Sequence, residues 1–242
     1  MTTASKNGYR PDLVDVAAGQ ISREIFVNDE IYREELERVF ARSWLFVGHE
    51  SQIPNPGDYF VSGMGEESVI LCRDRAGKVH VFLNSCRHRG MKVCRYDEGN
   101  TPVFTCPYHD WSYSTDGKLV GVPYFREAYH EKLDKSQWGL VEVPQLCRYK
   151  GTVWACWDPA APSFFEYLGE FVRYLDLTLD AGTAARVAPR SWAASRNGAS
   201  RATGNSRPKT FAATATTTSA TARSIWSASA PPAAGDATCR SG

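Results

Sequence analysis

Two short runs of the sequence each pair a cysteine with a histidine. The first is Cys86-Arg87-His88, and the second, after seventeen intervening residues, is Cys106-Pro107-Tyr108-His109. Two thiolates and two imidazoles suit a 2Fe-2S centre in which the cysteines hold one iron and the histidines hold the other. Neutral imidazoles in place of two anionic thiolates make an oxidised cluster easier to reduce, so the predicted chemistry is one-electron transfer.

The same four side chains could instead hold a structural zinc ion, because two cysteines and two histidines also form a tetrahedral zinc site. Zinc fingers usually place both cysteines in one short loop and both histidines in the other. Here each loop carries one cysteine and one histidine. The spacing favours the iron-sulfur cluster, and zinc remains the alternative.

The motif resembles the Rieske motif of aromatic ring-hydroxylating dioxygenases. The residues that carry the likeness are C-R-H-R-G-M at 86–91 and C-P-Y-H at 106–109. The resemblance is to the large, or alpha, subunit of these enzymes, and it extends over residues 21–180. By this resemblance the cluster ligands are Cys86, His88, Cys106 and His109. Asp110 departs from the pattern, because many members carry glycine before the tryptophan, so a less tight turn is expected there.

The resemblance implies a full-length enzyme that inserts both atoms of O2 into an aromatic ring at a mononuclear non-haem iron, giving a cis-dihydrodiol. It implies a ferredoxin and a ferredoxin reductase as electron donors, electron exit through His109, and a homotrimer that can include a small beta subunit. Two histidines and a carboxylate would hold the mononuclear iron. No histidine follows His130. We therefore expect this chain to bind the cluster and to be reduced without hydroxylating, and we predict no catalytic residue in it.

A stand-alone Rieske-type ferredoxin is the alternative function. Such carriers lack a long amino-terminal arm with a helix, and they lack a segment like residues 163–177. The flanks of the motif therefore favour the dioxygenase subunit.

Short β-rich runs separated by turns predict a mainly β fold, a small antiparallel sandwich or barrel of Rieske type with flanking helices. The expected strands are 21–26, 68–73, 79–84, 103–105, 112–114, 119–120, 141–143 and 152–157. Helices are expected at 29–42, with Asn28 as N-cap, and at 163–177. The second should bury one apolar stripe of Phe164, Leu168, Phe171, Val172 and Leu175. The predicted domains are an arm and helix at 1–43, a Rieske domain at 44–160, the start of a truncated catalytic domain at 161–180, and a tail at 181–242.

Both ligand pairs follow strand ends, where a rigid sheet can hold two loops against each other. Trp111 and Tyr113 are candidates to screen the cluster from water, or they are ordinary core aromatics. Arg87 and Arg89 are candidates for a basic rim that attracts an acidic ferredoxin, or they are ordinary solvated charges.

The overall charge is nearly balanced, with 28 Lys and Arg against 27 Asp and Glu. No apolar run approaches the eighteen or so residues of a membrane span, and no signal-peptide pattern follows Met1. We expect a cytoplasmic protein that binds neither nucleic acid nor membrane. Four of the seven cysteines are predicted to be reduced core residues, namely Cys72, Cys94, Cys147 and Cys156. Three histidines are expected to be surface or hydrogen-bonded residues, namely His49, His80 and His130.

The tail at 181–242 has a different composition from the rest of the chain. It contains 18 Ala, 9 Ser and 9 Thr, with 8 basic residues against 1 acidic residue. With so few large apolar side chains it cannot offset the entropy of ordering, so we expect disorder. It is either a natural low-complexity linker or the product of a shifted reading frame. The second hypothesis is favoured, because regrouped codons for residues 202–218 can encode a segment resembling E-N-F-x-G-D-x-Y-H of the family's catalytic domain.

Overall fold

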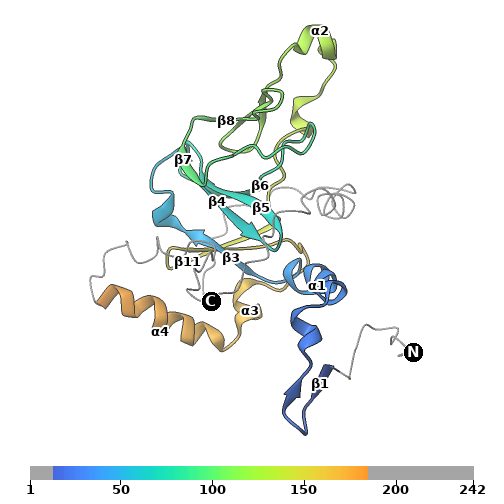
Figure 1. Cartoon of the computed structure of the whole chain (residues 1–242). Helices are drawn as coiled ribbons and strands as arrows, with labels where there is room; N and C mark the ends of the chain where they lie inside the picture. Colours follow the sequence, from blue (N-terminus) through green and yellow to red (C-terminus); the bar gives the residue numbers. More distant parts are fainter. Residues whose placement is uncertain (1–12, 185–242) are drawn as a thin grey trace, which may run out of the picture.

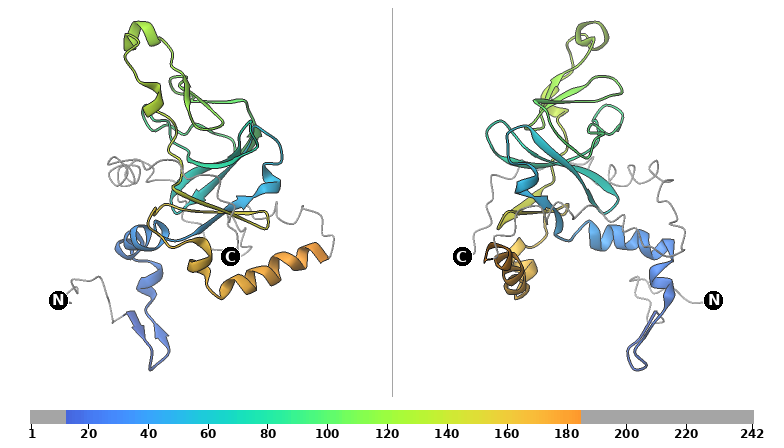
Figure 2. Two further views of the ribbon diagram at one scale, coloured as in Figure 1. Left: turned by 180° about the vertical axis from the view of Figure 1, so that it is seen from behind. Right: turned by 60° about the vertical axis from the view of Figure 1, so that its left-hand side comes forward.

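The computed structural model describes residues 13–184 of the chain. Residues 181–184 continue helix α4, so the prediction of disorder is wrong for them. The rest of the predicted tail, 185–242, lies outside the described residues, and its disorder stays a prediction. The described part consists mainly of antiparallel sheets with short helices around them (Figures 1 and 2). The expected fold class is therefore confirmed for these residues. Within this range no helix is both long and apolar enough to cross a lipid bilayer.

Two sheets that share an apolar layer form the centre of the molecule. The larger has the strand order β6-β5-β4-β7, and the smaller has the order β11-β12-β3. Their bounds are β3 Leu45–His49, β4 Asp58–Met64, β5 Glu67–Arg73, β6 Val79–Leu83, β7 Glu98–Asn100, β11 Gln145–Tyr149 and β12 Thr152–Cys156. Val47, Val69 and Val153 belong to the layer between the two sheets and are fully or almost fully buried.

A third sheet, in the order β10-β9-β8, shares a second apolar layer with the larger sheet. Its strands are β8 Val103–Thr105, β9 Ser112–Ser114 and β10 Leu119–Gly121. Strand β5 contributes to both layers: Val69 and Leu71 to the first, and Ile70 and Cys72 to the second. Because successive side chains of a strand point to opposite faces, β5 is apolar on both faces instead of alternating.

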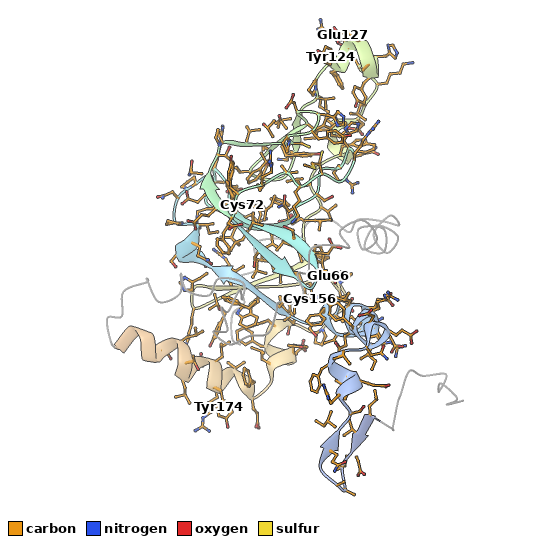
Figure 3. The ribbon with its side chains drawn as sticks, in the orientation of Figure 1. Glu66, Cys72, Tyr124, Glu127, Cys156 and Tyr174 are labelled. Carbon is orange, nitrogen blue, oxygen red and sulfur yellow. The ribbon has the colours of Figure 1, made fainter. Side chains whose placement is uncertain are left out.

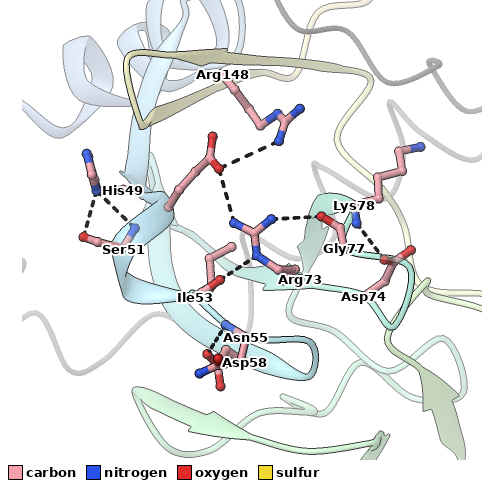
Figure 4. A network of polar contacts seen from close by, with 11 residues as sticks. His49, Ser51, Ile53, Asn55, Asp58, Arg73, Asp74, Gly77, Lys78 and Arg148 are labelled. Carbon is pink, nitrogen blue, oxygen red and sulfur yellow. Dashed lines mark hydrogen bonds and ion pairs between the residues drawn. The ribbon is translucent and has the colours of Figure 1, made fainter.

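The predicted turn at residues 74–78 joins β5 to β6, and Arg73 fixes it to the rest of the body (Figure 4). The Nε of Arg73 donates to the carbonyl of Ile53 at 2.7 Å, and one Nη donates to the carbonyl of Gly77 at 2.9 Å. The other Nη lies 3.2 Å from the carboxylate of Glu50. A partly buried guanidinium is stable here because these charge-assisted bonds replace its water.

The amino-terminal helix is shorter than predicted. Helix α1, Asp29–Glu35, begins at Asn28, whose side chain accepts hydrogen bonds from two N–H groups of the first turn, so the predicted N-cap is confirmed. A π-helical turn at Leu36–Phe40 then replaces the expected last turns. The predicted strand at 21–26 is wrong, because Arg23–Phe26 forms a 3-10 helix. Before it lies a hairpin of two short strands, β1 Val14–Asp15 and β2 Gln20–Ile21, each two residues long.

The predicted helix at 163–177 is two helices, α3 Phe164–Leu168 and α4 Phe171–Ala184. Gly169 separates them with φ 51° and ψ −130°, a backbone conformation that glycine adopts without a steric penalty. Phe171 was expected in the buried stripe, but it is 58% exposed. Phe164 in α3 is buried, so the two helices do not form one continuous buried stripe.

The strand expected at 141–143 is reduced to one bridge between Phe82 and Glu142. Strands β3, β4, β7 and β11 were not predicted. A short helix, α2 Phe125–Tyr129, lies at the tip of a lobe that projects from the third sheet (Figure 1).

His80 on β6 is 5% exposed and lies between two carboxylates. Its Nδ1 is 2.7 Å from Glu142, and its Nε2 is 3.2 Å from Asp74. Burial lowers the pKa of His80, but the hydrogen bonds and charges of Glu142 and Asp74 outweigh burial, so the pKa lies above its ordinary 6.5. Through Glu142 the ring joins β6 to the segment that returns from the third sheet.

We predict that His80 stabilises the fold most strongly in acid. Because its pKa is raised on folding, the contribution is fully present below the unfolded pKa and is lost as pH rises through the folded pKa. In urea titrations His80→Gln should lower the free energy of unfolding by about 1.5–3 kcal/mol near pH 5.5, and by less near pH 9. An equal loss at both pH values would contradict this assignment.

Candidate metal centre

The two loops that carry the cysteine and histidine pairs lie against each other. The first follows β6 and the second connects β8 to β9. Cys86 and Cys106 are 3% and 1% exposed, and their thiols are within hydrogen-bonding reach. The ring centroids of His88 and His109 are 4.7 Å apart. The structure thus brings together all four residues that the sequence singled out, as one pair of sulfurs and one pair of imidazoles.

Both loops have the same backbone turn. In the first, the N–H of Cys86 donates to the carbonyl of Met91, and the N–H of Gly90 donates to the carbonyl of Cys86, both at 2.8 Å. The second loop repeats the two bonds around Cys106, at 2.9 and 3.0 Å. The residue four positions after each cysteine has a positive φ, 73° at Gly90 and 56° at Asp110. The two cysteines therefore occupy equivalent positions in matching turns.

His88 has a ring nitrogen that the protein leaves without a partner. Its Nδ1 is buried and makes no hydrogen bond, although buried polar atoms normally have one. The ring stacks on Trp111, with centroids 5.0 Å apart and planes 9° apart. Burial, together with the charges of His109 and Arg89, lowers the pKa of His88 and favours the neutral ring that binds metal. This nitrogen fits a metal ligand.

Polar donors surround the two sulfurs. The hydroxyl of Tyr113 lies 3.2 Å from the Sγ of Cys86 and accepts a hydrogen bond from the N–H of Arg87 at 3.0 Å. Burial raises the pKa of Cys106, while the N–H groups of Tyr108 and His109 act in the opposite direction. Donors aimed at sulfur stabilise a thiolate, which is the form that binds iron.

The arrangement suits two metal ions better than one. A tetrahedral zinc site needs all four donors around one ion, whereas each iron of a 2Fe-2S cluster takes only two protein ligands. The pairing of sulfur with sulfur and imidazole with imidazole therefore fits the cluster.

Aromatic side chains cover the histidine side of the centre. Trp111 is 2% exposed and contacts Tyr129 and Trp138 of the α2 lobe, with ring centroids 6.1 and 5.7 Å away. Figure 3 shows Tyr124, at the tip of this lobe, pointing away from the body. Trp111 and Tyr113 are buried core residues, as the packing interpretation predicts, and a role in screening a cluster from water stays a prediction.

Arg87 and Arg89 are exposed beside the histidines. Neither forms an ion pair with any residue in the described range of the chain. Two apolar side chains next to them, Met91 and Tyr108, are 41% and 57% exposed. The surface over the centre is therefore basic and partly apolar.

The other cysteines and histidines lie apart from this centre or serve packing. The thiols of Cys72, Cys94 and Cys156 are unpaired and buried, and burial raises the pKa of Cys94 to about 12. Cys147 is fully buried but disulfide-bonded, so the prediction of a reduced thiol is wrong for this residue.

Sequence reasoning missed Asn84, which is 3% exposed and lies two residues before the first cysteine. A buried asparagine directly after an apolar strand is the signal that could have identified it.

Comparison with known proteins agrees with this geometry. The Rieske [2Fe-2S] domain family matches residues 43–144. The chain is 46% identical over 183 residues to chlorobenzene dioxygenase subunit alpha of Cupriavidus sp. strain PS12, covering 74% of this chain and 40% of that protein. It is 44% identical over 189 residues to biphenyl dioxygenase subunit alpha of Metapseudomonas furukawaii, covering 74% and 41%.

Residues 43–144 therefore match the Rieske [2Fe-2S] domain family, and the chain is similar to dioxygenase alpha subunits. The solved naphthalene 1,2-dioxygenase from Rhodococcus sp. superimposes on it with a TM-score of 0.64 and 45% identity, over 67% of this chain and 37% of that one. A quaternary ammonium Rieske monooxygenase superimposes with a TM-score of 0.57 and 28% identity, over 64% and 42%. The chain spans about 40% of the length of the curated relatives it matches.

The positive φ of Asp110 in the Rieske domain yields a prediction about stability. A residue with a Cβ is strained in this region, and glycine is not. Asp110→Gly should stabilise the protein by about 0.5–1 kcal/mol, which raises the midpoint of thermal unfolding by about 1–4 °C. The matched change in the other loop, Gly90→Asp, should lower the midpoint. A fall in the midpoint for Asp110→Gly would show that the aspartate side chain stabilises the turn.

Proposed function

We propose that this chain binds a 2Fe-2S cluster and carries single electrons to an aromatic ring-hydroxylating oxygenase reaction. Cys86 and Cys106 would hold one iron, and His88 and His109 would hold the other. The observation that carries the proposal is the unpartnered, buried Nδ1 of His88 beside a second imidazole, with two buried thiols in equivalent turns. When bound, such a cluster accepts and releases one electron.

The protein's own residues would keep reorganisation small and water away. Tyr113 and the N–H groups of Tyr108 and His109 present donors to the sulfurs before any change of charge occurs, so they need not move when it does. Trp111 covers His88 with its stacked ring. His109 is only half-buried, and its ring lies 3.8 Å from the exposed ring of Tyr108. We infer that electrons leave through His109.

The flanks favour an oxygenase subunit over a stand-alone carrier. Trp44, which precedes β3, donates to the carbonyl of Pro162 at 2.9 Å, and Lys150 pairs with Asp176 on α4 at 2.7 Å. Helices α3 and α4 are thereby fixed to the small sheet (Figure 2). We assign neither an aromatic substrate nor the mononuclear iron to the described residues, and we propose that this chain by itself does not hydroxylate. We place it in the cytoplasm, where the free thiols of Cys72, Cys94 and Cys156 stay reduced.

The proposal is tested on the purified 242-residue chain. It should contain about two irons and two acid-labile sulfides per chain, and after reduction it should give a rhombic electron paramagnetic resonance (EPR) signal. Cys106→Ser should abolish the signal. The matched control Cys94→Ser, at a buried cysteine of the same core, should retain it. Colourless protein with one zinc per chain and no sulfide would contradict the proposal and favour the zinc site.

A ferredoxin is the proposed electron donor, supplied in turn by a ferredoxin reductase, and a homotrimer with a small beta subunit is the proposed assembly. The basic surface at Arg87 and Arg89 should attract an acidic ferredoxin. The double change Arg87→Glu, Arg89→Glu should slow reduction by ferredoxin about tenfold at low salt, and the difference should shrink as salt screens the charges.

The control for this experiment is Arg173→Glu on α4, which lies at the opposite end of the molecule from the α2 lobe (Figure 1). The rate with a small chemical reductant, measured in parallel, reveals any change in the cluster itself. If Arg173→Glu slows reduction by ferredoxin as much as the double change at Arg87 and Arg89 does, docking at the proposed basic rim is contradicted.

A further inference from the structure

The two ligand loops are closed at their bases in different ways. The second loop lies inside a hairpin, so the strand pair Thr105 and Ser112 closes it directly beside Cys106. The first loop leaves β6 and leads to β7, and these strands lie at opposite edges of the larger sheet. Three strand spacings, about 14 Å, separate the two edges. No strand pairing can therefore close the first loop.

The side chain of Asn84 closes the first loop instead. Its Oδ1 accepts hydrogen bonds from the N–H groups of Val93 and Cys94, both at 2.9 Å. Its Nδ2 donates to the carbonyl of Cys94 at 2.9 Å and to the hydroxyl of Ser68 at 3.2 Å. Asn84 thus bonds both the N–H and the carbonyl of Cys94, which is what a paired strand residue would do.

The amide is also anchored to the rigid part of the fold. The backbone N–H of Asn84 donates to the carbonyl of Ser68 on β5 at 2.8 Å, which extends the β5–β6 ladder by one residue. Since Asn84 is 3% exposed, water cannot replace its bonds to Val93 and Cys94 if the side chain is removed. Its four side-chain bonds therefore set where the loop that carries Cys86 and His88 begins and ends.

We propose that Asn84 is the positioning residue of the Rieske centre: it replaces strand pairing at the base of the first loop and so holds Cys86 and His88 against the second loop. Asn84 acts through the loop backbone and does not bind the cluster. The inference rests on the proposed function, because the cluster is what needs the two loops in register.

Asn84→Ala tests the proposal, with Ser68→Ala as the matched control. Ser68 receives a bond from the same amide but lies on β5, outside the loop. In Asn84→Ala the rate of iron release to a chelator should rise at least about tenfold, as for changes of residues that orient metal ligands. The rhombic EPR signal of the molecules that keep their cluster should broaden, and the reduction potential should shift. Ser68→Ala should change the rate of iron release by less than about twofold relative to the wild-type chain.

A residue needed only for overall stability would lower the unfolding temperature and leave the EPR signal and potential of the loaded molecules unchanged. That result for Asn84→Ala would overturn the proposal. If Asn84→Ala does not fold, hydrogen exchange of the wild-type chain decides. The amides of Val93 and Cys94 should be the slowest to exchange in the first loop, and fast exchange there would overturn the proposal equally.

The outcomes also separate this inference from the proposed function. A wild-type chain that contains no iron and sulfide would contradict the proposed function itself. A wild-type chain that contains the cluster, with an Asn84→Ala variant identical to it in signal, potential and release rate, would contradict only the role of Asn84.

Discussion

The structure depends on the contact between two loops, which brings two thiols together as one pair and two imidazoles as another. Loops alone cannot keep such a register, because each would lose conformational entropy that its own few contacts do not offset. The matching turns around Cys86 and Cys106 reduce this cost, since internal backbone bonds shape each loop. Tyr113 then joins them, because its hydroxyl reaches from β9 to the first loop.

The layered sheets supply the rigid base. Strand β5 is buried on both faces, so the larger sheet is fixed by one apolar layer toward β3 and β12 and by another toward β8 and β9. The second layer continues directly into the ligand loops, and Cys86, Cys106 and Trp111 are members of it. A disturbance of this core would therefore displace the metal centre, whereas the amino-terminal hairpin and α4 lie at the far end of the molecule (Figures 1 and 2).

The sequence predicted which two cysteines and two histidines the fold brings together, the short strands β8 and β9 and the hairpin at 74–78, because each carries a local signal of spacing, alternation or turn residues. It did not predict β4 or β11, whose alternation is interrupted by small and polar residues, such as Ser62 and Gly63 in β4. It also failed at Phe171, because the apolar periodicity continues across Gly169 although the backbone conformation of this glycine ends helix α3 there. The role of Asn84 required the strand order, which no local pattern contains.

Mixed ligation is the central claim, and pulsed EPR of the reduced protein tests it most directly. The chain would be produced with all its histidines labelled with 15N, and the nitrogen couplings of the cluster signal would be compared with those of unlabelled protein. The account predicts two strongly coupled nitrogens, both shifted by the label. A cluster signal without histidine nitrogen coupling would contradict it, because four sulfur ligands would then hold the irons.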